Sequence, residues 1–183
     1  MKPKIGHGDK GRTSIIGCNL SKTSPLVSLI GSLDELNSFI GFSRSLLYSN
    51  EDSRFRDLDG IMKEIQTHIF LISSELVGAK LKSRITKKEV EWIENVIDKL
   101  EKEIKPITCF VYPSGSVPAS SLQVARAVCR RVERKAFKFS KRERIIRSEI
   151  LAYLNRLSDL LFTLARVVNN RLNFDEEFWK SEN

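Results

Sequence analysis

A glycine-rich stretch near the N-terminus, GHGDKGRTS at residues 6–14, carries residue types that bind phosphate. Its glycines expose backbone N–H groups, and its basic and hydroxyl side chains add hydrogen-bond donors and positive charge. The stretch matches a P-loop only loosely, because Arg12 stands where that loop needs a lysine and neither a buried strand nor a helix flanks it. Two interpretations remain open: an arm that wraps a polyphosphate, or a terminal segment with ordinary turn glycines.

A second group of candidate residues lies in SSLQVARAVCRRVERKAF, residues 120–137. Arg126, Arg130 and Glu133 are spaced i, i+4 and i+7, which places them on one face of a helix, with Arg131 and Arg134 beside them. Guanidinium groups bind phosphate oxygens in pairs, and a neighbouring carboxylate can orient them. The same spacing also fits a solvated ladder of salt bridges.

A third group interrupts the apolar stretch ILAYLNRLSDLLFTLARVV, residues 150–168. Asn155, Asp159 and Arg166 fall along one line of the helix predicted there. Buried polar groups need hydrogen-bond partners, so we expect these residues to pair with Arg126 or Arg130. Such a pairing indicates a site or a subunit interface.

Helices must position the second and third groups, because apolar residues between 24 and 172 recur every three or four positions. We expect five helices, at about 24–47, 52–76, 86–105, 119–139 and 149–172, the third opened by a capping box at Thr86 and Glu89. The proline-rich residues 106–118 exclude a helix and include a short strand-like run at 108–112. The sequence therefore predicts an all-α, up-and-down five-helix bundle.

The bundle is expected to form one domain over residues 1–183. Residues 1–23 form an extended arm, residues 24–172 the bundle, and residues 173–183 a tail that frays or docks through its aromatic residues. No apolar run reaches the length of a membrane span, and no secretory signal is evident. Three widely spaced cysteines without a CxxC pair fit a reducing cytoplasm. The net charge of +8 allows a nucleic acid, an anionic membrane or a phosphate-rich substrate as partner.

Four blocks, taken together and in this order, resemble the PduO-type ATP:cob(I)alamin adenosyltransferases, the cobalamin adenosyltransferases. They are GDKGRTSIIG at 8–17, DELNSFIGFSRS at 34–45, VARAVCRRVER at 124–134 and YLNRLSDLLFTLAR at 153–166. The resemblance implies a ferritin-like five-helix bundle that forms a homotrimer with active sites between subunits. It also implies transfer of the 5′-deoxyadenosyl group from ATP to cob(I)alamin, which gives adenosylcobalamin and triphosphate.

The resemblance further implies roles for the matching residues. ATP and its Mg²⁺ would be held by Gly8, Asp9, Lys10, Gly11, Thr13, Ser14 and Lys22 of the arm, by Arg130, Arg131, Glu133 and Arg134, and by Asn155. Glu133 is the candidate ligand of Mg²⁺. Asp34 and Arg126 would form a salt bridge across the subunit boundary, and Phe110 would press on the lower face of the corrin ring. With Arg130, these three are the candidate catalytic residues, since a Co(I) nucleophile needs no general base.

The chain departs from the family pattern at several positions. Ile5, Gly6 and His7 stand where the family has Thr-Lys-Thr before its Gly-Asp, Leu26 replaces an arginine, and Gln123 replaces a histidine. These changes remove phosphate contacts, so a catalytically weak paralogue that binds ATP or corrinoid is one alternative. A basic helical nucleic-acid-binding module is another, although the basic residues are scattered and show no recognition motif. A reductase and a B12-dependent acceptor enzyme are the further partners that we expect; a membrane is not among them.

Overall fold

The structure of the chain is a computed structural model, which describes residues 6, 8–15, 18–48 and 53–179. These residues form five α-helices and one short β-hairpin. The helices are α1 (Pro25–Tyr48), α2 (Arg56–Leu76), α3 (Lys87–Glu101), α4 (Val117–Arg142) and α5 (Ser148–Arg171). The hairpin strands are β1 (Arg12–Ile15) and β2 (Cys18–Ser21), and a short 3-10 helix, η1 (Ser53–Phe55), leads into α2.

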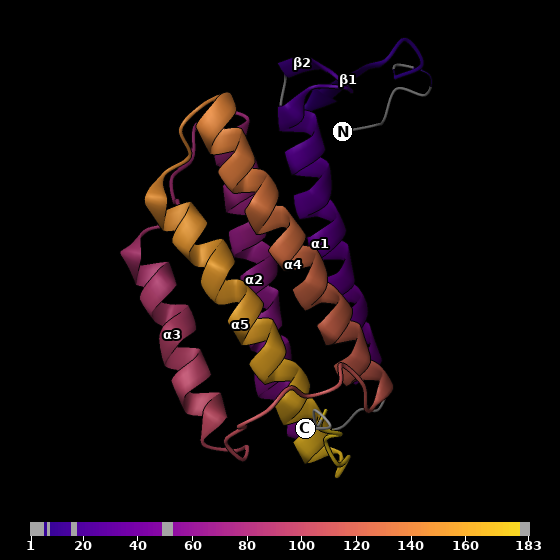
Figure 1. The fold of residues 1–183 in the computed structure, drawn as a ribbon. Coiled ribbons are helices and arrows are strands. Elements are labelled where there is room, and N and C mark those ends of the chain that lie inside the picture. The colour runs from indigo at the N-terminus through magenta and orange to yellow at the C-terminus, as the bar shows by residue number, and fades with distance from the viewer. Residues whose placement is uncertain (1–5, 7, 16–17, 49–52, 180–183) are drawn as a thin grey trace.

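The helices lie side by side, and consecutive helices run in opposite directions (Figure 1). α1 packs between α2 and α4, and α5 packs between α4 and α3. The predicted all-α, up-and-down five-helix bundle is therefore confirmed. Among the described residues, none of these helices has both the length and the apolar character that a bilayer span requires.

The apolar stripes expected from helical spacing form the core. On α4 the buried stripe consists of Leu122, Ala125, Cys129, Val132 and Ala136. On α2 it consists of Leu58, Met62, Ile65, Ile69 and Ile72. Because burial of one large apolar side chain contributes about 1.5–3 kcal/mol, these stripes determine which face of each helix turns inward. The arginines of α4 are thereby left on its outer side.

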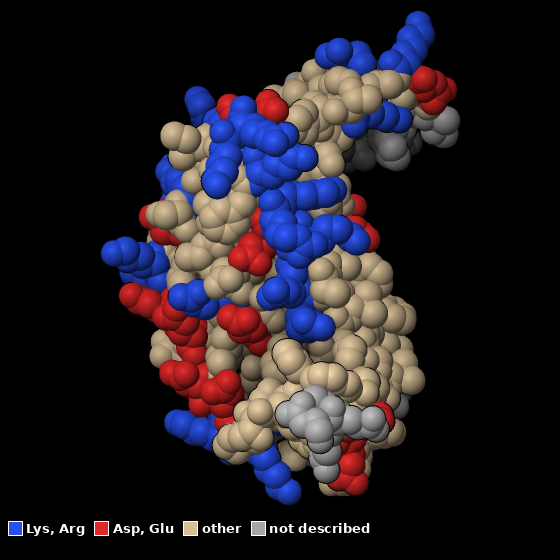
Figure 2. Space-filling model, viewed as in Figure 1, with Lys and Arg blue, Asp and Glu red and all other residues tan. Residues whose placement is uncertain are grey.

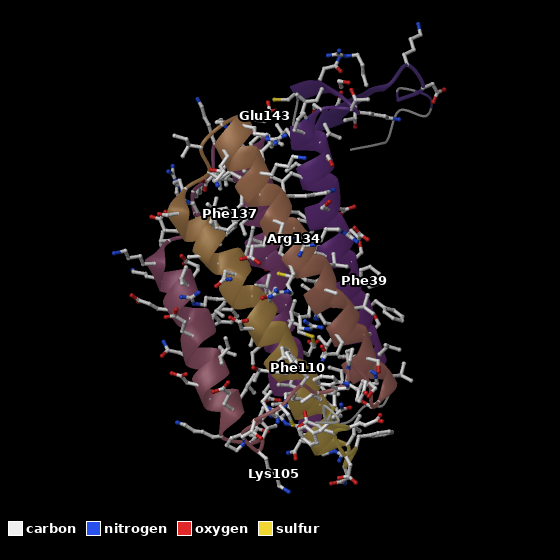
Figure 3. The ribbon with its side chains drawn as sticks, viewed as in Figure 1. Phe39, Lys105, Phe110, Arg134, Phe137 and Glu143 are labelled. Atoms are coloured by element: carbon white, nitrogen blue, oxygen red, sulfur yellow. The ribbon has the colours of Figure 1, made fainter. Side chains whose placement is uncertain are left out.

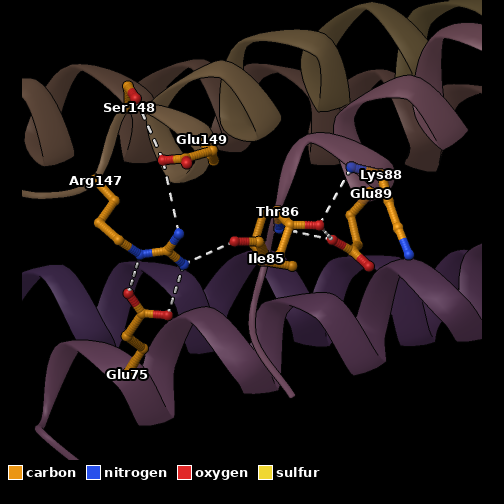
Figure 4. A network of polar contacts seen from close by, with 8 residues as sticks. All are labelled: Glu75, Ile85, Thr86, Lys88, Glu89, Arg147, Ser148 and Glu149. Carbon is orange, nitrogen blue, oxygen red and sulfur yellow. Dashed lines mark hydrogen bonds and ion pairs between the residues drawn. The ribbon is translucent and has the colours of Figure 1, made fainter.

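Polar contacts tie together the connections at one end of the bundle (Figure 4). The predicted capping box opens α3: the Thr86 hydroxyl accepts from the backbone N–H of Lys88, and Glu89 accepts from the Thr86 N–H. Arg147, just before α5, donates to both carboxylate oxygens of Glu75 at 2.7 and 2.9 Å and to the Ile85 carbonyl at 2.7 Å. The α2–α3 and α4–α5 connections are thus held against each other.

The N-terminal arm contains a hairpin that the sequence pattern did not reveal. β1 and β2 pair antiparallel, with Arg12 opposite Ser21, and project beyond the start of α1 (Figure 1). Arg12 donates from Nε to the side-chain oxygen of Asn19 and from Nη2 to its carbonyl, both at 2.9 Å. The arginine in place of a P-loop lysine therefore fastens the hairpin. Strands of four residues are too short for their alternation to stand out in the sequence.

The C-terminal tail docks against the connection between α3 and α4. Of the strand-like run expected at 108–112, the structure has one residue in β pairing: Val111 forms an isolated antiparallel bridge with Phe178. The Tyr112 N–H donates to the Glu177 carbonyl at 2.8 Å, and the Trp179 N–H donates to the Phe110 carbonyl at 2.9 Å. Of the two outcomes expected for the tail, the structure thus shows docking.

Candidate functional site

A small cleft opens where α4, α5 and α3 meet. It has a volume of about 170 Å³, and its lining includes Arg126 and Arg130 of α4 with Asp159 and Phe162 of α5. The buried stripe of α4 turns these two arginines toward α5, because they lie on the neighbouring face of the same helix. The structure therefore brings together two of the predicted catalytic residues.

The two arginines of this cleft lack a carboxylate partner within the described residues. Arg126 donates from Nε to the side-chain oxygen of Gln123 at 2.7 Å, and its two terminal amino groups have no hydrogen-bond acceptor there. Burial, and after it the positive charge of Arg130, lower the pKa of Arg126. Asp159 and Glu101 line the same cleft, but among the described residues neither forms an ion pair with these arginines, so both guanidinium groups keep donors available for an anion.

Glu133 and Asn155 join α4 to α5 beside this cleft. The Asn155 amide donates to Glu133 Oε1 at 2.9 Å, while its carbonyl oxygen accepts from Arg156. Asn155 therefore finds its partner on α4, but the partner is Glu133 and neither of the arginines expected. The salt-bridge ladder that the spacing allowed is not formed, because Glu133 makes no ion pair with any described residue.

The other two candidate arginines of α4 differ in their surroundings. Arg131 forms an ion pair with Glu35 of α1, and both side chains are about half exposed. Arg134 is exposed one turn beyond Arg130 and has no ion-pair partner in the described part of the chain (Figure 3). Figure 2 shows that Lys and Arg side chains gather along the face over α4 and toward the end of the bundle where that helix ends.

The partner expected for Arg166 was wrong. This residue is 6% exposed, and it donates to the two carboxylate oxygens of Glu176 in the tail at 2.6 and 2.8 Å and to the Lys105 carbonyl at 2.7 Å. Its guanidinium group also lies 5.9 Å from the centre of the Phe162 ring, while Arg126 lies 6.0 Å from the same ring. Arg166 thus anchors the tail, and Phe162 separates it from the cleft.

A second cleft, of about 300 Å³, lies between the hairpin, α1 and α2. Its lining includes Thr13 of β1, Asp34 and Asn37 of α1, and Phe70 of α2. Asp34 is exposed and pairs with no described residue. Asp34 and Arg126 therefore lie in separate clefts, and the predicted salt bridge between them is not made within one chain.

Of the remaining arm candidates, Gly8, Asp9, Lys10 and Gly11 lie in the turn that precedes the hairpin, Ser14 lies in β1, and Lys22 follows β2. Backbone hydrogen bonds close this turn from Asp9 to the Gly6 carbonyl and from Gly11 to the Gly8 carbonyl, both at 3.2 Å. Gly11 has φ +73°, a left-handed conformation that favours glycine. A Cβ atom at Gly8 would lie 2.8 Å from Lys22 Nζ, so the Lys22 ammonium group lies close to the turn. Lys10 and Ser14 are exposed.

The described residues of the arm, 6, 8–15 and 18–23, do not reach the arginine cleft of the same chain, since none of them lines it. Two positions where the sequence departs from the family pattern, Ile5 and His7, lie outside the described residues.

Phe110 lies at the foot of the bundle, at the end opposite the arm (Figure 3). Its side chain is 76% exposed, and its ring lies 6.1 Å from that of Trp179. Asn169 holds the same loop from the other side: its amide donates to the Ser114 carbonyl at 3.0 Å, and its oxygen accepts from the Ser116 N–H at 2.9 Å. The exposed ring of Phe110 thus lies on a loop that contacts Asn169 on one side and Trp179 on the other.

Comparison with known proteins connects these features to a family. The cobalamin adenosyltransferase family model matches residues 4–168. The chain belongs to this family. It is 38% identical to the corrinoid adenosyltransferase of Bacillus subtilis, over 99% of this chain and 94% of that protein. It is 34% identical to the human corrinoid adenosyltransferase MMAB, over 90% of this chain and 68% of the relative.

A solved structure of the family has the same fold. It is a variant PduO-type ATP:corrinoid adenosyltransferase from Lactobacillus reuteri complexed with cobalamin and ATP, with a TM-score of 0.86 and 31% identity. The match covers 97% of this chain and 99% of that one. The resemblance noted from four sequence blocks is therefore confirmed, as is the fold class that it implied.

Two residues that line the clefts, Phe162 and Asn37, and a third that contacts Arg126, Gln123, were missed by the sequence reasoning as site residues. Phe162 lies three positions after Asp159, and Gln123 three positions before Arg126, so helical spacing alone associates each with a residue already singled out. Asn37 follows Asp34 by the same interval on α1. None of the three carries a charge, and none interrupts an apolar stretch as Asn155 does.

Proposed function

We infer that the chain transfers the 5′-deoxyadenosyl group of ATP to a reduced corrinoid. The electron pair of Co(I) forms a bond to C5′ of the ribose as the C5′–O bond breaks, and triphosphate leaves with the electrons of that bond. The observation that carries this function is the set of α4 arginines without carboxylate partners, in a member of the cobalamin adenosyltransferase family. No side chain has to remove a proton, since no proton moves in this step.

The triphosphate binds along α4. Arg126, Arg130 and Arg134 follow one another from the Phe110 end of the bundle toward the arm end. This order supports a substrate that lies with its ribose near Phe110 and its phosphates beside Arg130 and Arg134. Their guanidinium groups stabilise the negative charge that grows on the departing oxygen. Arg131 adds its positive charge to this stabilisation once its ion pair with Glu35 opens. Asn155 holds Glu133 in place and contacts the nucleotide.

The arm of a neighbouring subunit completes the phosphate site. The turn backbone and side chains contribute donors from Gly8, Asp9, Lys10, Gly11, Thr13, Ser14 and Lys22. Support comes from the closeness of the Lys22 ammonium group to the glycine turn and from the distance between the arm and the arginine cleft within one chain. A homotrimer with sites between subunits satisfies both observations, and Asp34 of one subunit pairs with Arg126 of the next.

Mg²⁺ accompanies the triphosphate, and Glu133 is its protein ligand. Among the described residues no three His, Cys, Asp or Glu side chains gather into a metal site. A single carboxylate fits Mg²⁺, because this ion takes few protein ligands when substrate phosphates and water supply the rest. Bound Mg²⁺ would neutralise part of the phosphate charge.

Phe110 acts on the corrin ring. An exposed aromatic ring on a loop supported by Asn169 and the tail is suited to press on one face of a flat macrocycle. By occupying the lower face it excludes an axial ligand there, which makes Co(II) easier to reduce. We place the enzyme in the cytoplasm, with a reductase that supplies the electron and a B12-dependent enzyme that takes the product.

An anaerobic absorbance assay tests this function. The chain, ATP, Mg²⁺, a strong reductant and cob(II)alamin should form one cobalt–carbon bond for each triphosphate released. A folded chain that binds ATP and corrinoid without forming the bond would instead be a non-catalytic paralogue. Failure to bind ATP, with salt-dependent binding of duplex DNA, would favour the nucleic-acid interpretation.

A further inference from the structure

Asn37 of α1 holds a buried side-chain oxygen that no described residue satisfies. The residue is 6% exposed, and its Oδ1 is the one buried side-chain polar atom in the described part of the chain without a hydrogen-bond partner. Its backbone carbonyl, in contrast, accepts from the Gln66 amide at 3.1 Å. Because a buried carbonyl without a donor is unfavourable, the isolated chain gains stability when a donor reaches Oδ1.

The position of Asn37 indicates what kind of donor this is. Asn37 lines the cleft between the hairpin, α1 and α2 together with Asp34, which lies one helical turn away on the same face. Asp34 is exposed and pairs with no residue that the structure describes. A carboxylate and an amide oxygen side by side require a group with several N–H donors and a positive charge. A guanidinium group meets both requirements.

The same chain carries such a group at a different place. Arg126 uses Nε to donate to Gln123, and its two terminal amino groups find no acceptor among the residues described. Its packing near the Phe162 ring, at 6.0 Å, limits where its guanidinium group can turn. Since Arg126 lines the other cleft, it cannot serve the Asn37 cleft of its own chain. The acceptors of one copy and the donors of another are therefore complementary.

We propose that the guanidinium group of Arg126 from a second copy of the chain enters the α1 cleft and is held there by Asp34 and Asn37 together. Asn37 is then a positioning residue: it fixes the plane of the guanidinium group that Asp34 attracts. Because Arg130 lies one turn from Arg126 on α4, this contact also aligns the phosphate-binding face against the neighbouring arm. The proposal rests on the subunit arrangement of the proposed function.

A substitution series with subunit dissociation as its readout tests this contact. Asn37→Leu keeps the side-chain volume but removes the acceptor, and we expect it to raise the concentration for half-dissociation about tenfold, as measured by sedimentation on dilution. Asn37→Asp keeps an acceptor in place and should stay within about twofold of the unmodified chain. Ser38→Ala, on the exposed side of α1, is the matched control and should leave dissociation unchanged.

A double-mutant cycle identifies the donor. Arg126→Lys keeps the charge that Asp34 attracts but lacks the fork that reaches a second acceptor. In the Arg126→Lys background, Asn37→Leu should change the concentration for half-dissociation by less than about twofold, because the contact between residues 37 and 126 is already lost. Asn37→Ala serves for the same cycle if the leucine variant fails to fold.

Three results would overturn the proposal: an unmodified chain that stays monomeric, additive effects in the cycle, or a raised KM for ATP with unchanged assembly, which would assign Asn37 to the nucleotide. The cycle is independent of turnover. If the effects of Asn37→Leu and Arg126→Lys on dissociation are not additive but the chain forms no adenosylcobalamin, the proposed function is refuted and the contact between Asn37 and Arg126 is not.

Discussion

The arginines of α5 and those of α4 are alike in sequence and opposite in surroundings. Around α5, each arginine holds a carboxylate of its own chain: Arg147 with Glu75, Arg156 with Glu94, Arg166 with Glu176, and Arg171 with Asp57 and Glu103. On α4, Arg131 pairs with Glu35, but four arginines hold no carboxylate among the described residues: Arg126, Arg130, Arg134 and Arg142. Part of the net charge of +8 is therefore gathered on one helix face.

This difference separates arginines that stabilise the fold from arginines that are available to bind. A buried ion pair that loses one member leaves the other charge uncompensated, so the two largely buried α5 arginines, Arg166 and Arg171, are costly to remove. An arginine without a counter-charge contributes little to folding and gains its counter-charge from a ligand or a second subunit. Among the described residues, α4 thus carries several arginines that form no ion pair and that can bind a ligand or a second subunit.

Replacing Arg130 should have the largest effect on activity. We expect Arg130→Ala to lower kcat/KM for adenosyl transfer by about 10²–10³-fold, because it removes charge that stabilises the departing triphosphate. The unfolding temperature should stay unchanged, since no carboxylate is left behind. Lys138→Ala, also exposed on α4, is the matched control and should retain activity. A large drop in unfolding temperature for Arg130→Ala would place it with the α5 arginines instead.

Replacing Arg171 should show the reverse pattern. Its guanidinium group is 15% exposed and bonds to both oxygens of Asp57, at 2.7 and 2.8 Å, and of Glu103, at 2.9 Å. Arg171→Leu should lower the free energy of unfolding by about 2–4 kcal/mol in urea titrations. The activity of the protein that remains folded at 25 °C should be unchanged. Lost activity without lost stability would contradict the comparison.

Acid titration provides a control for the Arg171 pair. The hydrogen bond from Arg171 lowers the pKa of Asp57 below its usual value of 3.8, against the opposing effect of burial. A carboxyl group with a lowered folded-state pKa stabilises the fold above its unfolded pKa, and this stabilisation is lost as pH falls through the folded value. The stability difference between the unmodified chain and Arg171→Leu should therefore shrink below about pH 3.8.

The pH dependence of the free energy of unfolding tests how unfavourable a protonated His68 is in the core. His68 is buried, its Nδ1 lies 2.9 Å from the Tyr153 hydroxyl, and Glu64 lies 3.2 Å from its Nε2. Burial lowers its pKa from 6.5, although Glu64 opposes this. The unfolded chain then takes up a proton first, so stability falls as pH drops below 6.5, by at most about 1.4 kcal/mol per pH unit.

Urea titrations between pH 7.5 and 5.5 measure this dependence. His68→Gln keeps a polar partner for Tyr153 and should flatten the curve, whereas His7→Asn should leave it as it is. A curve that keeps its slope in His68→Gln would assign the pH dependence to another group.

The smallest effect is expected for Arg156. Its ion pair with Glu94 spans 3.0 Å, but the two side chains are 42% and 47% exposed. Solvent screens such pairs, so Arg156→Ala should change the free energy of unfolding by less than about 0.5 kcal/mol in the same titrations. A change as large as that of Arg171→Leu would show that an ion pair on α5 stabilises the fold by the same amount whether it is exposed or buried.

Much of the fold was predictable because helical periodicity is a local property. The helix expected at 119–139 extends over Val117–Arg142, and the capping box at Thr86 begins α3 as predicted. The β-hairpin was missed because each strand has four residues and depends on its partner for hydrogen bonds. The docked tail could not be distinguished from a frayed one, since its bridge joins Val111 to Phe178, far apart in the chain.

The sequence by itself determined which face of each helix is apolar, and with it the bundle and the side of α4 on which the arginines lie. It also determined family membership, through four motifs in order. Only the tertiary structure decided which carboxylate each polar side chain of α5 meets: Arg166 pairs with Glu176 of the tail, and Asn155 donates to Glu133. The reason is physical. The apolar face follows from residues three and four apart, whereas an ion pair between distant elements depends on how the helices and the tail pack in space.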